Sequence, residues 1–75
     1  MKLNELKVDT PAVICNIALE EKDKKRLFFI GLYKGANIIK LQVAPLGDPV
    51  LYFVLGNQII LRNADAQRIE VEVKE

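Results

Sequence analysis

Residues 39–62 read IKLQVAPLGDPVLYFVLGNQIILR, and this stretch decides the fold. Apolar and polar side chains alternate over 39–43, which is the two-residue period of a β-strand that buries one face. Residues 50–55 are apolar at every position, and this predicts a strand that is apolar on both faces. Gly56-Asn57 then predicts a two-residue hairpin that leads into a further strand over 58–62.

The first two of these strands are joined by Pro45-Leu46-Gly47-Asp48-Pro49, which predicts a sharp reversal. Gly47 supplies the positive φ that such a turn requires, and Pro49 holds the preceding Asp48 in an extended conformation. Towards the C-terminus, Asn63 is expected to cap a single helical turn over 64–67. Apolar and charged residues then alternate in a last strand, with Ile69, Val71 and Val73 on one face.

The N-terminal half adds one strand and one helix. Val13, Cys15, Ile17 and Leu19 are spaced two apart, which predicts a half-buried strand with these side chains on its inner face. A segment of mixed acidic and basic residues over 20–26 follows, which is typical of a solvated turn. Within it, Asp23 is expected to cap a short amphipathic helix over 24–30. Leu27 and Ile30 share one side of that helix, Gly31 ends it, and the helix is expected to lie over the sheet.

These elements predict a mainly β fold: a small SH3-like barrel of about five strands with one short helix, forming a single domain over residues 1–75. Strands this short must close on themselves to avoid open edges. The chain has 11 basic and 10 acidic residues, a net charge of +1, so it has no strong field for nucleic acid. It also lacks an apolar run long enough to insert into a membrane.

The residue types exclude most chemistry. Histidine, serine and tryptophan are absent, so no nucleophile has its usual base, and we expect neither enzymatic activity nor a cofactor. Cys15 is the single cysteine, which excludes an internal disulfide, favours a reducing cytosol, and indicates a buried structural residue. No metal site is expected, although Asp48 and Asp65 could form a weak carboxylate site if the fold brought them together.

With these elements in place, the chain resembles the FeoA family, small cytosolic accessory proteins of bacterial ferrous iron transport. The resemblance covers nearly the whole chain and is carried by the following residues: Leu3-x-x-Leu6, Ala12-Val13, Leu27-x-x-x-Gly31-Leu32-x-x-Gly35, Ala44 to Pro49, Gly56-x-x-Ile59-x-Leu61-Arg62 and Asp65-Ala66-x-x-Ile69-x-Val71. It departs from the family at Asp9, where glycine is usual, and at Phe29, a helix position that is commonly polar.

The resemblance implies a cytoplasmic, non-enzymatic regulator that docks on the cytosolic GTPase portion of FeoB, the membrane iron transporter. Two alternatives remain: a general SH3-like protein-interaction module, which could form a homodimer through Phe29 and Tyr33, and a weak transition-metal sensor. The predicted contact surface is an apolar and aromatic patch around the helix end and the Pro-Gly turn, although the same residues would also suit ordinary packing in so small a barrel. Its members are Phe29, Leu32, Tyr33, Leu46, Gly47, Asp48 and Tyr52.

Because consecutive helix residues differ in direction by about 100°, Phe28 and Phe29 cannot face the same side. One of the two is therefore expected to be exposed.

Overall fold

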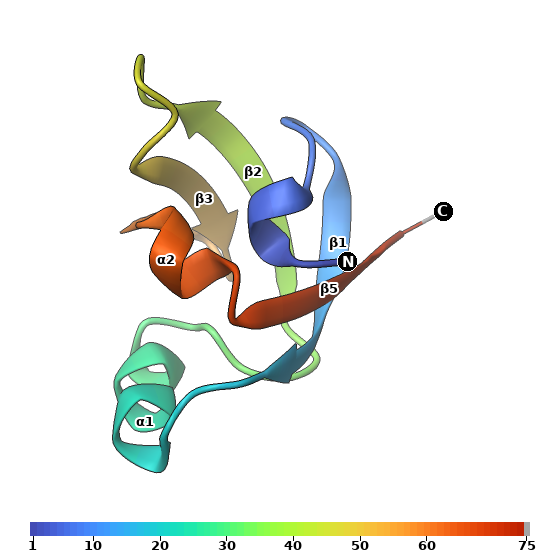
Figure 1. Cartoon of the computed structure of the whole chain (residues 1–75). Coiled ribbons are helices and arrows are strands. Elements are labelled where there is room, and N and C mark those ends of the chain that lie inside the picture. Colours follow the sequence, from blue (N-terminus) through green and yellow to red (C-terminus); the bar gives the residue numbers. More distant parts are fainter. Residues whose placement is uncertain (75) are drawn as a thin grey trace.

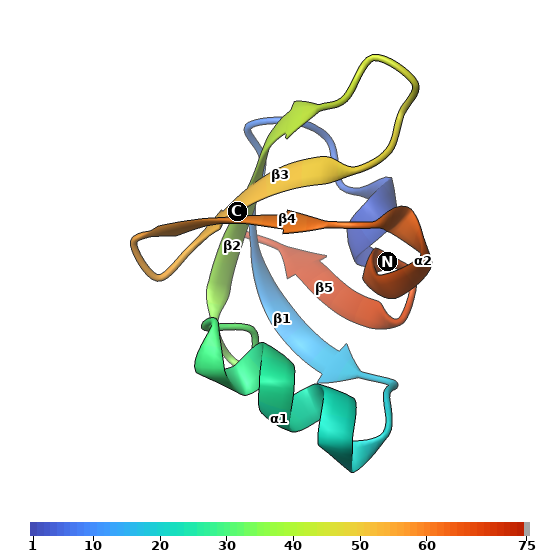
Figure 2. The same cartoon turned by 90° about the vertical axis from the view of Figure 1, so that its left-hand side faces the viewer.

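The computed structural model describes residues 1–74, which form five strands, two helices and a 3-10 turn. The strands make one antiparallel sheet in the order β4-β3-β2-β1-β5, which curls into a barrel (Figures 1 and 2). The mainly β class, the five strands and the short helix are confirmed. The elements are η1 (Leu3–Glu5), β1 (Pro11–Ile17), α1 (Glu21–Phe29), β2 (Asn37–Val43), β3 (Val50–Val54), β4 (Asn57–Leu61), α2 (Asn63–Ala66) and β5 (Ile69–Val73).

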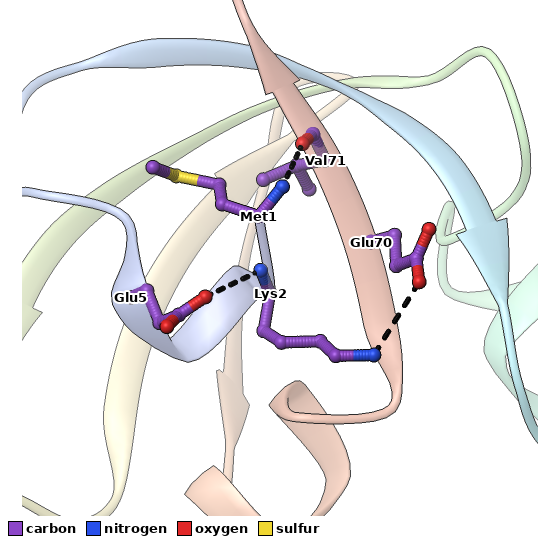
Figure 3. Close-up of polar contacts among 5 residues, drawn as sticks. All are labelled: Met1, Lys2, Glu5, Glu70 and Val71. Atoms are coloured by element: carbon purple, nitrogen blue, oxygen red, sulfur yellow. Dashed lines mark hydrogen bonds and ion pairs between the residues drawn. The ribbon is translucent and has the colours of Figure 1, made fainter.

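The first residues of the chain complete the barrel at the free edge of β5. The backbone N–H of Val71 donates to the carbonyl of Met1 at 2.9 Å, and the N-terminal amine of Met1 donates back to the carbonyl of Val71 at 3.2 Å. Lys2 reaches Glu70 on the same strand with an Nζ–Oε1 distance of 3.4 Å (Figure 3). Open sheet edges invite unwanted pairing, so this segment protects the β5 edge while Leu3 enters the core.

The inner face of β1 differs from the prediction. Ala12 and Ile14 are buried, whereas Val13 and Cys15 are only half-buried. The pairing with β5 shifts register between Ile14 and Asn16, so one extra residue bulges out and Ile17 returns to the inside. Cys15 is the bulged residue, and its thiol lies 3.6 Å from the carbonyl oxygen of Val13. The expectation of a buried structural cysteine was therefore wrong.

The buried face of β2 is also displaced by one residue from the apolar positions of its alternating pattern. Its inner face carries Ile38 and Lys40, whereas Ile39 and Leu41 are half-buried on the outer face and Val43 is exposed. An alternating pattern defines two faces, and the tertiary pairing decides which of them turns inward. In β3 one face is buried through Val50, Tyr52 and Val54, whereas Phe53 on the other face is exposed. In β5 the predicted apolar face is confirmed at Ile69 and Val71, which are buried, but Val73 at the end of the strand is exposed.

The β3–β4 hairpin turns one residue earlier than predicted. Val54 pairs with Asn57, so the two loop residues are Leu55 and Gly56. Both have positive φ, 48° and 84°, as a turn of the I′ type requires. Glycine takes this conformation without strain, whereas Leu55 must be held in it by the pairing on either side.

Asp9 also lies in the left-handed region, with φ of 63°, and its N–H donates to the carbonyl of Lys40 at 2.8 Å. Aspartate tolerates this conformation better than most residues do, so the turn into β1 keeps the shape that glycine would allow.

Candidate protein-interaction surface

Helix α1 lies at one end of the barrel, beyond the end of β1 and the start of β2, rather than over the sheet as predicted (Figures 1 and 2). It begins at Glu21, three residues before the predicted start. No side chain caps it, and the carboxylate of Asp23 instead forms an ion pair with Arg26 at 3.4 Å. Glu21 and Asp23 still favour the first turn because acidic groups complement the positive end of the helix dipole.

Gly31 ends the helix as predicted. It has φ of 95°, its N–H donates to the carbonyl of Phe28 at 3.0 Å, and the N–H of Leu32 donates to that of Leu27 at 2.9 Å. These two bonds are the Schellman arrangement, in which the residue after the left-handed glycine packs against the last turn. Leu27 and Leu32 are accordingly buried together, whereas Ile30, predicted to share the buried side, is exposed.

The two phenylalanines at the end of α1 are both exposed, not one as expected. Phe29 exposes 82% of its surface and Phe28 56%. The Phe28 ring lies edge-on to Phe29, with centroids 5.9 Å apart, and at a tilt to Tyr33, with centroids 5.4 Å apart. Three aromatic rings thus form a continuous row across the end of the helix and the loop that follows it. Contiguous exposed aromatic surface is typical of a protein contact.

A groove of about 310 Å³ runs beside this row, between α1, the end of β1 and the loop after the helix. We call it the α1 groove. Ile17 and Leu32 are buried, Phe28 and Tyr33 contribute aromatic surface, and Lys25 and Lys34 are exposed. The full set of lining residues is Asn16, Ile17, Glu21, Lys24, Lys25, Phe28, Leu32, Tyr33 and Lys34.

The sequence contained a signal for this groove that the prediction missed. Glu21, Lys24, Lys25 and Phe28 are spaced three and four apart, so they lie on one face of the helix. The charged segment was interpreted only as a solvated turn. Its lysines instead stand beside exposed aromatic rings, which is a more specific arrangement than a mixed-charge surface.

The structure divides the predicted contact patch. Phe29 and Tyr33 remain together beside α1, whereas Leu46, Gly47 and Asp48 lie on the turn between β2 and β3, at the opposite end of the molecule (Figures 1 and 2). Leu32 and Tyr52 are fully buried in the core, so their predicted exposure was wrong. Leucine and tyrosine are residue types that suit both a contact surface and a core, and only the packing shows that these two belong to the core.

The turn with Leu46 has a clear structural role. Gly47 has φ of 89°, as predicted, and Leu46 beside it is 97% exposed. The Oδ1 atom of Asp48 accepts a hydrogen bond from the backbone N–H of Asn63 at 2.8 Å, and the Asn63 amide donates to the carbonyl of Gly47 at 2.8 Å. Asp48 therefore satisfies the first turn of α2, a role predicted for the Asn63 side chain itself.

Polar groups also lie inside the barrel. Lys40 and Tyr52 face each other across β2 and β3, and both are buried. Desolvation lowers the pKa of Lys40, whose Nζ donates to the carbonyl of Asn4 at 3.0 Å. Burial and the nearby negative charge of Asp48 raise the pKa of Tyr52 to about 12. The Tyr52 hydroxyl has no hydrogen-bond partner among the described residues.

Within residues 1–74, no group of three histidine, cysteine, aspartate or glutamate side chains is arranged to hold a metal ion. Asp65 lies in the first turn of α2 and Asp48 contacts the start of that helix, but no third ligand joins them. No helix of the described chain is long and apolar enough to cross a membrane.

Comparison with known proteins identifies the chain. The model of the FeoA domain matches residues 1–73. The chain is 38% identical over 73 residues to a fusion protein of Porphyromonas gingivalis that joins Fe(2+) transport protein A to the Fe(2+) transporter FeoB. That match covers 97% of this chain but only 9% of the fusion protein.

Solved structures agree with this assignment. The solution structure of iron(II) transport protein A from Clostridium thermocellum superimposes with a TM-score of 0.92 and 38% identity, covering 97% of this chain and 45% of that one. The zinc complex of FeoA from Stenotrophomonas maltophilia, described as an SH3 domain protein, has a TM-score of 0.78 and 32% identity, and covers 96% of this chain and 89% of that one.

The chain thus spans less than half the length of the fusion protein and of the first of these structures. The predicted SH3-like barrel is confirmed, and so is the resemblance that residues 3–71 carried. On the match over residues 1–73 and the shared fold, this chain belongs to the FeoA family of ferrous iron transport proteins.

Proposed function

We propose that this chain is a non-enzymatic regulatory protein of ferrous iron transport that acts in the cytoplasm by docking on the cytosolic GTPase portion of a FeoB-type transporter. The observation that carries the proposal is the fusion relative, in which a domain like this one and FeoB are parts of one polypeptide. Fusion keeps two domains at a high effective concentration, which is useful when they act on each other.

The end of the barrel that carries α1 is the surface we assign to this contact. It presents Phe28 and Phe29 to solvent, and a third ring, Tyr33, extends the row. Exposing large aromatic side chains is unfavourable for an isolated small domain, because each leaves apolar area in water. Burial against a partner would recover that free energy.

An amide-shift titration of the isotope-labelled protein with the cytosolic portion of the transporter tests the proposal. We expect shifts to cluster over residues 25–34. Phe29→Ser should abolish or strongly weaken binding without unfolding the protein, since the side chain makes few contacts with the barrel.

Leu46→Ser is the matched control, because Leu46 is even more exposed than Phe29 but lies at the opposite end of the molecule. If Leu46→Ser weakens binding and Phe29→Ser does not, docking occurs through the turn between β2 and β3 and the assigned surface is wrong. If the transporter portion causes no shifts in either nucleotide state, the proposed function itself is refuted.

A further inference from the structure

We propose that the α1 groove binds an acidic peptide segment of a partner protein, and that one large apolar side chain of this segment anchors in the groove. The inference rests on the proposed function insofar as the transporter is the expected source of the segment. It goes further by naming the chemistry that the segment must have.

The apolar part of the groove is suited to a single anchor. Ile17 and Leu32 are held in the core beneath the groove, so its base is fixed before a ligand arrives. Phe28 and Tyr33 are already in contact with each other, with ring centroids 5.4 Å apart. The volume of about 310 Å³ lies at the lower end of the usual range for ligand pockets, roughly 300–1,000 Å³. It accommodates one aromatic or long aliphatic side chain.

The charge around the groove sets the sign of the ligand. Residues 21–34 contain five basic and two acidic side chains, a net charge of +3, whereas the rest of the chain has six basic and eight acidic ones, a net charge of −2. All of the excess positive charge is therefore concentrated around one short helix and the loop after it.

Two of the groove lysines have no acid of their own. Glu21 lies 3.9 Å from Lys24, so these two charges largely offset each other. Lys25 and Lys34 form no ion pair within residues 1–74. Acidic residues that flank the anchor on both sides would supply the missing partners. A complementary potential of this kind also speeds association and excludes basic or neutral segments.

Fluorescence anisotropy with a short labelled peptide tests this inference directly. The probe has one central phenylalanine flanked by glutamates and glycines. One control peptide replaces the phenylalanine with alanine, and a second replaces the glutamates with lysines. We expect saturable binding of the probe alone, and binding that weakens as salt is raised, because these charges are exposed to solvent.

The decisive variant is the double charge reversal Lys25→Glu with Lys34→Glu. Each reversal removes an attraction and adds a repulsion, so we expect the Kd for the probe to rise about thirtyfold. Its matched control is Lys7→Glu with Lys74→Glu, which makes the same change in net charge at two exposed lysines outside α1 and its groove. The control should leave the Kd within about twofold, since charges beyond a Debye length are screened.

The outcomes separate this inference from the proposed function. If the transporter portion binds equally to wild type and to the Lys25→Glu, Lys34→Glu variant, and the probe does not bind, the acidic segment is refuted as the occupant of the groove. Docking on the transporter then still stands. If the probe binds with the expected charge dependence and the transporter portion does not, the groove is supported and the proposed partner is wrong. Self-association abolished by the same variant would identify a second copy as the occupant and refute the inference.

Discussion

The buried hydroxyl of Tyr52 allows a sharp test of the structure. Tyr52→Phe removes only the oxygen, and the ring keeps its place in the core. The hydroxyl is fully buried and has no hydrogen-bond partner among the described residues. A buried polar group without a partner costs about 1–3 kcal/mol. We therefore expect the free energy of unfolding at neutral pH to increase by about 1–3 kcal/mol, measured by urea denaturation.

The same substitution has a second, pH-dependent effect. The pKa of Tyr52 is raised from 10.0 to about 12, so the folded state favours the neutral phenol and the unfolded state ionises first. The stability that this shift contributes is fully present below pH 10 and is lost as the pH rises towards 12. A shift of two units corresponds to about 3 kcal/mol. The advantage of Tyr52→Phe over wild type should therefore grow by about 1.4 kcal/mol between neutral pH and pH 11.

Comparing the two proteins at each pH isolates the Tyr52 contribution, because lysines such as the facing Lys40 titrate in both. Tyrosinate absorbance provides an independent measurement, in which Tyr52→Phe should remove the transition near pH 12 and Tyr33→Phe should retain it. A variant less stable than wild type at neutral pH would mean that the hydroxyl has a hydrogen-bond partner. A stability difference that does not change with pH would contradict the raised pKa.

Four further substitutions test other parts of the structure. Leu27→Ala should reduce the free energy of unfolding by about 2–5 kcal/mol, because it leaves a cavity where a buried side chain packs under α1. Phe29→Ser should change the free energy of unfolding by less than about 0.5 kcal/mol, because that side chain is exposed. Thermal unfolding distinguishes these outcomes, since each 1 kcal/mol shifts the Tm of a domain this size by roughly 4–8 °C. Lys40 has a lowered pKa, so its positive charge destabilises the folded state until the side chain loses its proton. The free energy of unfolding of the wild type should therefore include a rise as the pH increases towards 10.5. Lys40→Met should remove that rise, as measured by urea denaturation across this pH range. Asp48→Ala should lower the free energy of unfolding by about 1 kcal/mol, because it removes the acceptor for the backbone N–H of Asn63. Relative to wild type, amide exchange should become faster at Asn63 and stay unchanged at the start of α1.

Much of the fold could be predicted because the strands have a strong two-residue period and the turns have distinctive residues. Gly31 and Gly47 were placed correctly, since each takes a positive φ that side-chain-bearing residues rarely adopt. The hairpin was displaced by one residue because Leu55, not Asn57, takes the left-handed conformation. Local preference favoured asparagine there, and the pairing of β3 with β4 overrode it.

The candidate site was only half predictable. Phe29 and Tyr33 were correctly placed at the end of the helix, but the lysines beside them were interpreted as a solvated surface. Leu46 was grouped with them although the barrel separates it from α1 by the length of β2. Tyr52 was included because its composition suits a contact, although it is the largest fully buried side chain of the core.

By itself, the sequence determined the fold class, the number of strands, the positions of most turns and the family. These can be inferred from patterns of residues that lie close together in the chain. Only the tertiary structure decided that Lys40 turns inward while Ile39 turns outward, that the bulge at Cys15 reverses the face of β1, and that Phe29 is exposed while Tyr52 is not. The physical reason is that an alternating pattern defines the two faces of a strand but does not decide which face is buried. Register and bulges decide that, and they arise only when strands that are distant in the sequence pair with each other.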